Sequence, residues 1–584
     1  MNKNRILQRT IWVIVATMLV CVLGLARETA LAQIGADQST VSNQIFMPPV
    51  SHSIPDQDWP VEVQVVDQDE IPISRRVLAR GAQLHGANGV NFGPDGLLYL
   101  ASFIGGDIQV MNPKNGHIVR NIELPFEMNG PDDLTFGPDG FLYYTSISTG
   151  KVGRIAPDGT QPSEVAQLPP GANPITFSDD GRLFVALDFL GDGLYEIYLD
   201  GSEPRLILPL LGFLNAFDFG PDGYLYGPIY TQGTVVKIDV DSGEMWEVAN
   251  GFFMPVAVKF DAYGQLYLNV QGTGEVVRMN PDGSEQELVA RLTPGLDNLA
   301  FDSRNQLFVS HAEDGIVYRI LPNGKGVPIS RGGMIAPQGV AVLPDSEGHE
   351  RVFVADFWTL REFNGQTGQT GRVDYRALGA PHTVAPDGGN LVVSSWMDNA
   401  VYTYDPDAMT LVGEPRYDFA APMNAIRFQG DLVVSELGTG SVVRSSGPGD
   451  RQVLAVLGLP IGLAATEDDL YVADWAIGAV FQLIADGVPV VIPLAFGLQS
   501  PEGLAVAPDG NSLLVVEPSA GRVSSIALAT GQVTTFLDGL KIGLPAISNM
   551  PPFFTFNGIA VGPSGAVYVT GDKANVLYRI DVRP

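Results

Sequence analysis

One short phrase recurs along most of this chain and constrains its fold more than any other feature. Clear copies are NGVNFGPDGLLYLAS from Asn88, DDLTFGPDGFLYYTS from Asp132 and NAFDFGPDGYLYGPI from Asn215. With fainter copies such as EGLAVAPDG from Glu502, the phrase occurs twelve times, at intervals of about 41 residues. A repeat of this length predicts an array of similar units rather than several unrelated domains.

Each copy is written in the residues of short strands and tight turns. The PDG segments predict turns, because Pro fixes φ at one corner and Gly supplies a positive φ at another. An alternating apolar stretch follows each turn, as at 97–100, and no stretch after residue 58 has a sustained helical period. Four short strands in each repeat of about 40 residues are the pattern of a β-propeller blade.

Twelve copies exceed one ordinary ring, since propellers typically have about 4–8 blades. We therefore predict an all-β fold of two tandem six-bladed β-propellers with about twelve four-stranded blades, over residues 58–326 and 327–584. The sequence Pro-Ile-Ser-Arg at 72–75 recurs at 328–331, and the last copy ends after its third strand. We expect residues 71–80 to close the first ring and 327–331 the second. A 7+5 split, or closing strands exchanged between the rings, are the alternatives.

The amino terminus has the pattern of an export signal. Basic residues including Lys3 and Arg9 precede a largely apolar run over 11–26, and Ala30 and Ala32 form an A-x-A site before Gln33. We predict a signal peptide over 1–32, then a disordered leader over 33–57 that is poor in periodicity. The protein is expected to be secreted, extracellular or periplasmic, without a stable membrane anchor after cleavage. An uncleaved anchor is the alternative.

Charge and cysteine content exclude several classes of function. The formal net charge is −31, so nucleic acids and anionic membranes are poor partners and cations are better ones. Cys21 is the single cysteine and lies in the apolar run, so cysteine zinc sites, CxxC redox pairs and intrachain disulfides are excluded. The chain also lacks GxxxxGK[ST], GxSxG, HExxH and EF-hand motifs.

Two sets of phrases resemble known propeller families. The VAD phrases at 354–356 and 472–474 resemble NHL repeats, and the phrases PEGLAVAPDG from Pro501 and FNGIAVGPSG from Phe556 resemble the SMP-30/gluconolactonase group. The resemblance covers nearly all of residues 85–584. It implies a divalent cation at the mouth of the central channel, held by Glu, Asn and Asp side chains that lie four residues before an apolar residue of the innermost strand.

That position can be followed through the repeats, and ten of the twelve side chains there are polar. Val256 and Ile461 are the apolar exceptions, and Gln338 and His382 also occupy the position. The resemblance implies as metal ligands Asn88, Asp132, Asn173, Asn215 and Asp297 in the first ring, and Asn424, Glu502 and Asn557 in the second. Oxygen donors favour Ca²⁺ over Zn²⁺.

This donor set departs from the family, because the first ring lacks the Glu and the second lacks the Asp. Asn and Asp also recur where loops join strands for purely local reasons, since they tolerate positive φ and bond their own backbone. A structural role is therefore the alternative to metal binding at every one of these positions.

Three functions follow as hypotheses. The first is a binding or interaction module for a small molecule, glycan or protein, with a divalent cation at a channel mouth. The alternative is a metal-dependent hydrolase of lactones or esters. The lesser alternative is a lyase of the virginiamycin B lyase type, which needs a His and a Glu together, as His382 and Glu502 loosely provide. Catalytic candidates are Asp132, Asp297, Glu502 and His382.

Other residues near strand ends are predicted to have structural roles. His311 is expected to be a solvated loop residue. Repeated acids after second strands are expected to cap turns, and repeated tryptophans there are expected to pack between blades or to line a groove. The acids are Asp356, Glu436, Asp474 and Glu517, and the tryptophans are Trp358, Trp396 and Trp475.

Overall fold

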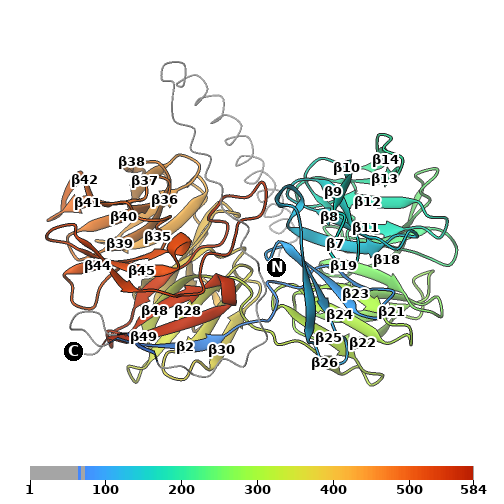
Figure 1. The fold of residues 1–584 in the computed structure, drawn as a ribbon, viewed down its shortest axis with the longest axis horizontal. Coiled ribbons are helices and arrows are strands. Elements are labelled where there is room, and N and C mark those ends of the chain that lie inside the picture. The colour runs from blue at the N-terminus through green and yellow to red at the C-terminus, as the bar shows by residue number, and fades with distance from the viewer. Residues whose placement is uncertain (1–63, 67–72, 583–584) are drawn as a thin grey trace, which may run out of the picture.

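The computed structural model describes residues 64–66 and 73–582, and these residues form the predicted all-β fold (Figure 1). They are arranged in twelve antiparallel sheets, eleven of four strands and one of five. The described helices are three 3-10 turns, η2 (Phe126–Met128), η3 (Pro518–Ala520) and η4 (Asp572–Ala574), and none could span a membrane. The predicted signal peptide (1–32) and leader (33–57) lie outside the described residues.

Six blades form the first ring, which closes where β23 contacts β3. Its blades, each from the inner to the outer strand, are β3 (Val90–Phe92), β4 (Leu98–Ser102), β5 (Asp107–Met111) and β6 (Ile118–Glu123); β7 (Pro131–Phe136), β8 (Leu142–Ser146), β9 (Lys151–Ile155) and β10 (Ser163–Gln167); β11 (Ala172–Phe177), β12 (Leu183–Leu187), β13 (Gly193–Ile197) and β14 (Arg205–Pro209); β15 (Asp218–Phe219), β16 (Leu225–Ile229), β17 (Thr234–Ile238) and β18 (Met245–Asn250); β19 (Pro255–Phe260), β20 (Leu266–Val270), β21 (Glu275–Met279) and β22 (Glu287–Arg291); and β23 (Leu296–Phe301), β24 (Leu307–His311), β25 (Ile316–Ile320) and β26 (Gly326–Pro328).

The second ring closes where β27 contacts β47. Its blades are β27 (Pro337–Pro344), β28 (Glu350–Asp356), β29 (Thr359–Asn364) and β30 (Thr370–Asp374); β31 (Thr383–Asp387), β32 (Asn390–Ser395), β33 (Ala400–Asp405) and β34 (Thr410–Leu411); β35 (Pro422–Phe428), β36 (Asp431–Glu436), β37 (Ser441–Ser445) and β38 (Gln452–Val456); β39 (Pro460–Ala465), β40 (Leu470–Asp474), β41 (Ala479–Ala485) and β42 (Val488–Phe496); β43 (Leu504–Val506), β44 (Ser512–Glu517), β45 (Arg522–Ala527) and β46 (Val533–Leu537); and β47 (Ile559–Val561), β48 (Val567–Gly571), β49 (Val576–Val582), β2 (Ile73–Arg80) and β1 (Gln64–Val66).

The recurring phrase encodes both a turn and a contact between blades. In the first copy, one carboxylate oxygen of Asp95 accepts a hydrogen bond from the Leu97 N–H at 3.1 Å, and the other accepts one from the Tyr99 hydroxyl at 3.1 Å. The Tyr99 ring is fully buried and meets the edge of Phe136 on the next blade, with centroids 5.0 Å apart. The same pairing of Tyr and Phe recurs at Tyr143 and Phe177, again at 5.0 Å.

The closing strands are exchanged between the rings. Strand β2 pairs with β49 of the second ring, from Ile73 opposite Val582 to Arg80 opposite Val576. The expectation that residues 71–80 close the first ring is therefore wrong. Ile73 and Leu78 are buried in apolar clusters of the second ring, and this burial holds β2 against that ring (Figure 1).

The first ring is closed instead by the segment that precedes the second. Strand β26 pairs with β25, and its continuation keeps this register, since the Ile329 N–H donates to the Val317 carbonyl at 2.9 Å. Only a short turn separates β25 from β26, so this hairpin forms locally. Each Pro-Ile-Ser-Arg segment thus lies in or beside the outer strand of a ring's last blade, but in the ring opposite to the one expected.

A long loop over 538–558 joins β46 to β47 and accounts for the longest step between repeats. Phe553 and Phe554 are buried in an apolar cluster that also includes Phe103 and Ile147 of the first ring. Two polar contacts fix the loop to that ring: the Ser548 N–H donates to the Asn129 side-chain oxygen at 2.8 Å, and the Asn549 amide donates to the Ser148 carbonyl at 3.2 Å. This loop covers the second ring and holds the two rings together.

Candidate functional site

The innermost strands begin at the channel of each ring, where neighbouring blades touch. The Gly89 N–H donates to the Asp132 carbonyl of the next blade at 2.7 Å. A Cβ at Gly89 would lie 2.6 Å from the Cα of Asp133, so only glycine allows this approach. The close packing places the side chains that begin each inner strand around one axis.

Two carboxyl groups share the mouth of the first ring. Asp132 and Asp297 are both partly exposed, and the Asn88 amide donates to the Asp297 carboxylate at 3.0 Å. Burial, followed by the charge of Asp297, raises the pKa of Asp132 well above its usual value. Burial, followed by the charge of Asp133, raises the pKa of Asp297 to about 7. Binding of a proton or a cation would therefore relieve the repulsion between the Asp132 and Asp297 carboxylates.

Two further carboxyl groups lie at this mouth and were not predicted. Asp133 is 7% exposed, and its carboxylate accepts hydrogen bonds from the Leu134 N–H at 2.9 Å and the Asn298 amide at 3.2 Å. Asp188 follows β12 and is fully buried. One of its oxygens accepts from the Asn173 amide at 2.9 Å, while the other has no partner among the described residues.

Burial, followed by the charge of Asp132, raises the pKa of Asp188. The charge of Asp297 raises the pKa of Asp188 further, so the carboxyl groups of this mouth disfavour one another's ionisation. The sequence offers one signal for it, because Asp188 follows the second strand of its blade at nearly the same place as the repeated acids Asp356 and Asp474.

The two other predicted ligands of this ring, Asn173 and Asn215, make different kinds of hydrogen bond. Asn173 is bound to Asp188, and so belongs to the cluster. The Asn215 side-chain oxygen accepts from the adjacent Ala216 N–H at 2.7 Å, which is the local backbone role that was the alternative. Within the described ranges, no three or more His, Cys, Asp or Glu side chains form a group able to hold a metal ion. A cation here would therefore also need amide oxygens or water.

The corresponding mouth of the second ring is covered. His382 is 2% exposed, and its ring lies 5.5 Å from that of Phe556 in the long loop. Glu502 is 4% exposed and accepts from the Asn557 N–H at 2.6 Å, and the Asn557 side-chain oxygen in turn accepts from the Gly543 N–H at 3.0 Å. Both catalytic candidates of this ring are therefore closed off from a substrate in this conformation.

Asn424 is likewise used within the second ring. It is 8% exposed, and its side-chain oxygen accepts from the Thr383 hydroxyl at 3.3 Å. Gln338 and His382 each keep one side-chain atom without a partner among the described residues. The predicted ligands of the second ring are therefore buried, and each is engaged in a hydrogen bond within the ring.

Substitution of His382 by glutamine is expected to remove an acid sensitivity of the fold. Burial lowers the pKa of His382 to about 3, so this residue is neutral in the folded protein and charged in the unfolded chain below about pH 6.5. The native protein should therefore lose stability from this group as the pH falls from about 6.5 toward 3. The free energy of unfolding is measured in urea at pH 7 and pH 4.5 for both proteins. Between these pH values, the native protein should lose about 2–3 kcal/mol more than His382→Gln does. Parallel pH profiles would contradict this expectation.

Several residues outside the mouths have the roles of structural groups. His311 is fully buried rather than solvated, because its Nε2 lies 2.9 Å from the Thr293 hydroxyl and its Nδ1 accepts from the Asp314 N–H at 3.1 Å. The prediction of a solvated loop was therefore wrong. Asp356 accepts from the N–H groups of Ile335 and Ala336, as expected of a turn-capping acid.

The other repeated acids and the tryptophans follow their predicted structural roles. Asp474 accepts from the Gly458 N–H at 2.7 Å, and Glu436 and Glu517 likewise accept from backbone N–H groups. The three tryptophans pack against the apolar cluster beneath and around the long loop, and the Trp475 ring lies 5.8 Å from Phe553. Trp396 is buried in this cluster, and Trp358 and Trp475 are partly buried against it.

Comparison with known proteins gives similarities of fold only. No family model and no curated protein matches this chain. A streptogramin B lyase structure is 17% identical and matches with a TM-score of 0.37 over 52% of this chain and 97% of that one. A gluconolactonase from Xanthomonas campestris is 15% identical, with a TM-score of 0.34 over 42% and 87%. An extracellular domain of a one component system from B. thetaiotaomicron is 12% identical, with a TM-score of 0.30 over 88% and 80%.

Proposed function

We propose that this protein is an exported binding protein whose first ring holds a divalent cation, Ca²⁺, at its channel mouth. A small molecule, glycan or protein would dock there. The observation that supports this most is the buried oxygen of Asp188 that has no partner among the described residues, at a mouth whose carboxyl groups raise one another's pKa. The covered mouth of the second ring favours the first ring as the functional one.

The donor chemistry suits calcium. Ca²⁺ takes about six to eight oxygen ligands from carboxylates, amides and water at flexible geometry. Asp132, Asp188 and Asp297 do not by themselves form a group able to hold a metal ion, so a cation would take some of these carboxylates together with amide oxygens and water. Carboxylates buried near one another repel when ionised, so a bound cation would stabilise the ring. It would also leave coordination positions facing the channel mouth for oxygen atoms of a ligand.

Calcium titration of the purified protein tests this function. At a hundredfold excess over Kd, binding stabilises a protein by about 2.7 kcal/mol, so we expect calcium to raise the unfolding temperature by about 5–10 °C and a chelator to remove that gain. Asp132→Asn with Asp297→Asn should abolish binding in calorimetry, because both substitutions replace charged donors. Glu203→Gln, on an exposed turn away from the channel, should bind as the native protein does. Equal binding by the double variant, or none by the native protein, would refute the proposal.

Metal-dependent hydrolysis of lactones or esters is the second candidate. Its support is that Asp132 and Asp297 stay partly exposed, so a carbonyl substrate could reach carboxylates in the first ring but not His382 or Glu502 in the second. A bound cation would polarise the carbonyl, and a nearby carboxylate would accept a proton from water. Turnover in a lactone and ester panel that vanishes with chelator and in Asp297→Asn would support it. The lyase alternative has no such support, because it needs the covered pair His382 and Glu502.

A further inference from the structure

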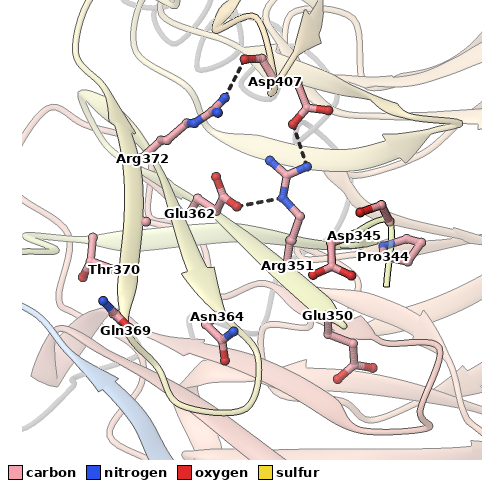
Figure 2. Close-up of a pocket in the computed structure, with 12 residues that line it drawn as sticks. Pro344, Asp345, Glu350, Arg351, Glu362, Asn364, Gln369, Thr370, Arg372 and Asp407 are labelled. Carbon is pink, nitrogen blue, oxygen red and sulfur yellow. Dashed lines mark hydrogen bonds and ion pairs between the residues drawn. The ribbon is translucent and has the colours of Figure 1, made fainter. Parts of the chain in front are cut away.

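A cavity of about 550 Å³ lies on the second ring at the end of its first blade (Figure 2). Its lining includes Pro344, where β27 ends, and Glu350, where β28 begins. The channel residues of the same blade lie at the opposite strand ends, near Gln338 and Asp356. This pocket is therefore separate from both channel mouths. Its volume falls in the range of about 300–1,000 Å³ that is usual for small-molecule sites.

One wall of the pocket is fixed by two arginines that reach the turn of the neighbouring blade. Arg351 donates to Glu362 at 2.7 Å and to Asp407 at 2.9 Å. Arg372 donates to the carbonyl of Pro406 at 3.1 Å and also to that of Asp407. Figure 2 shows both guanidinium groups directed toward Asp407, with Glu362 beside Arg351. The polar groups of this wall are thus held in place before any ligand binds, which lowers the entropy lost on binding.

A second part of the lining is polar and uncharged. Asn364, at the end of β29, Gln369, just before β30, and Thr370, its first residue, line the pocket and are exposed. The Asn364 side-chain oxygen accepts from the N–H groups of Gln366 and Thr367, which leaves its amide group as a donor toward a ligand. The pocket therefore offers amide, hydroxyl and guanidinium donors together with carboxylate acceptors.

The charges around the pocket narrow the class of ligand. An anion would meet four carboxyl groups, including Asp345 and Glu362, in a chain of net charge −31. A cation would meet two arginines, while Glu350 is already bound to Tyr568 and Arg579. An apolar ligand would cover these polar groups without replacing their hydrogen bonds to water, which is costly.

We infer that this pocket binds a neutral carbohydrate. Each sugar hydroxyl both donates and accepts a hydrogen bond, so a polyhydroxylated ligand can use the Glu362 carboxylate as an acceptor and the Gln369, Thr370 and Arg372 groups as donors. Such a ligand adds no charge to a pocket in which Arg351 is paired with Glu362 and Asp407 and Arg372 bonds two backbone carbonyls. The site does not depend on the proposed cation, because no predicted metal ligand lines it.

A glycan array of neutral and acidic sugars, followed by calorimetry with maltose, cellobiose, glucuronate and glucosamine, tests the inference. All binding is measured in EDTA, so that failure of the calcium proposal does not affect the result. We expect a neutral sugar to bind with a Kd of about 1 mM or tighter. Arg372→Met and Gln369→Ala should each weaken it about tenfold, because each removes a donor from the pocket wall. Glu347→Gln, on an exposed side chain near the pocket but outside its lining, is the matched control and should change Kd less than about twofold.

Unfolding temperatures near that of the native protein would show that the variants fold, and Gln369→Ala alone suffices if Arg372→Met does not. Absence of binding to every neutral sugar would overturn the inference. So would preferential binding of glucuronate or glucosamine, since that would assign the pocket to a charged ligand. Unchanged affinity in the folded variants would place the sugar elsewhere on the protein.

Discussion

A chain that begins at Gly81, and so lacks β1 and β2, is expected to lose the fold of the second ring while it keeps that of the first. Strand β2 supplies the fourth strand of the blade that closes the second ring, and it pairs with β49 from Ile73 to Arg80. Its removal exposes the edge of β49 and the apolar positions that Ile73 and Leu78 cover. Each of these side chains contributes about 1.5–3 kcal/mol by burial, so we expect a loss of about 5 kcal/mol or more with the backbone pairing included.

Calorimetry and limited proteolysis would detect the loss as a second ring that unfolds early or is digested. The matched control begins at Ile73, lacks only β1, and should unfold within about 1 kcal/mol of the full chain, because β1 is an edge strand of three residues. Addition of residues 73–80 after Val582 through a short linker should restore the second ring. If both truncated chains unfold alike, β2 does not close the second ring in solution.

The repeat itself made the fold predictable. Asp95 and Tyr99 show why: one side chain caps the turn and anchors the tyrosine, and the tyrosine packs on the next blade through Phe136. These contacts join residues that are close in sequence or one repeat apart, so each copy records them. The exchange of closing strands cannot be read from the repeat, because the two Pro-Ile-Ser-Arg segments are identical. Which ring each segment closes depends on pairing between residues far apart in the sequence, such as Ile73 and Val582.

The functional positions were predictable only as far as the repeat extends. Asn88, Asp132 and Asp297 lie in or just before the first residues of inner strands, and the Asn88 amide donates to Asp297 there. Glu502 and His382 occupy the equivalent places, but the loop over 538–558 covers them, and this loop is found in one repeat only. Asp188 was missed because acids after second strands were interpreted as turn caps, whereas its side chain bonds that of Asn173 on the neighbouring inner strand of the same blade.

Substitution of Phe554 in the long loop by alanine is expected to cause a large loss of stability. This side chain is 2% exposed, and its ring lies 5.7 Å from Phe103 of the first ring and 5.0 Å from Phe357 of the second. Truncation of a buried phenylalanine costs about 3–5 kcal/mol, because apolar surface is lost and a cavity remains. The cavity would lie between the rings and weaken their contact. In urea, the unfolding transitions of the two rings should therefore be further apart in the variant than in the native protein.

The matched control for that change is Phe126→Ala on the first ring. Phe126 is 63% exposed, and its truncation should alter stability by about 0.5 kcal/mol or less.

The long loop over 538–558 also carries Phe556, whose ring packs against that of His382. Phe556→Ala should therefore let water reach the imidazole and raise the pKa of His382 from about 3 toward its usual value, as proton NMR titration would show. An unchanged pKa would mean that Trp396 and the other residues of the mouth, rather than the loop, exclude water from His382. Such a result, together with a Phe554→Ala protein as stable as the control, would remove the long loop as the cover of the second ring and reopen that ring as a site for ligands.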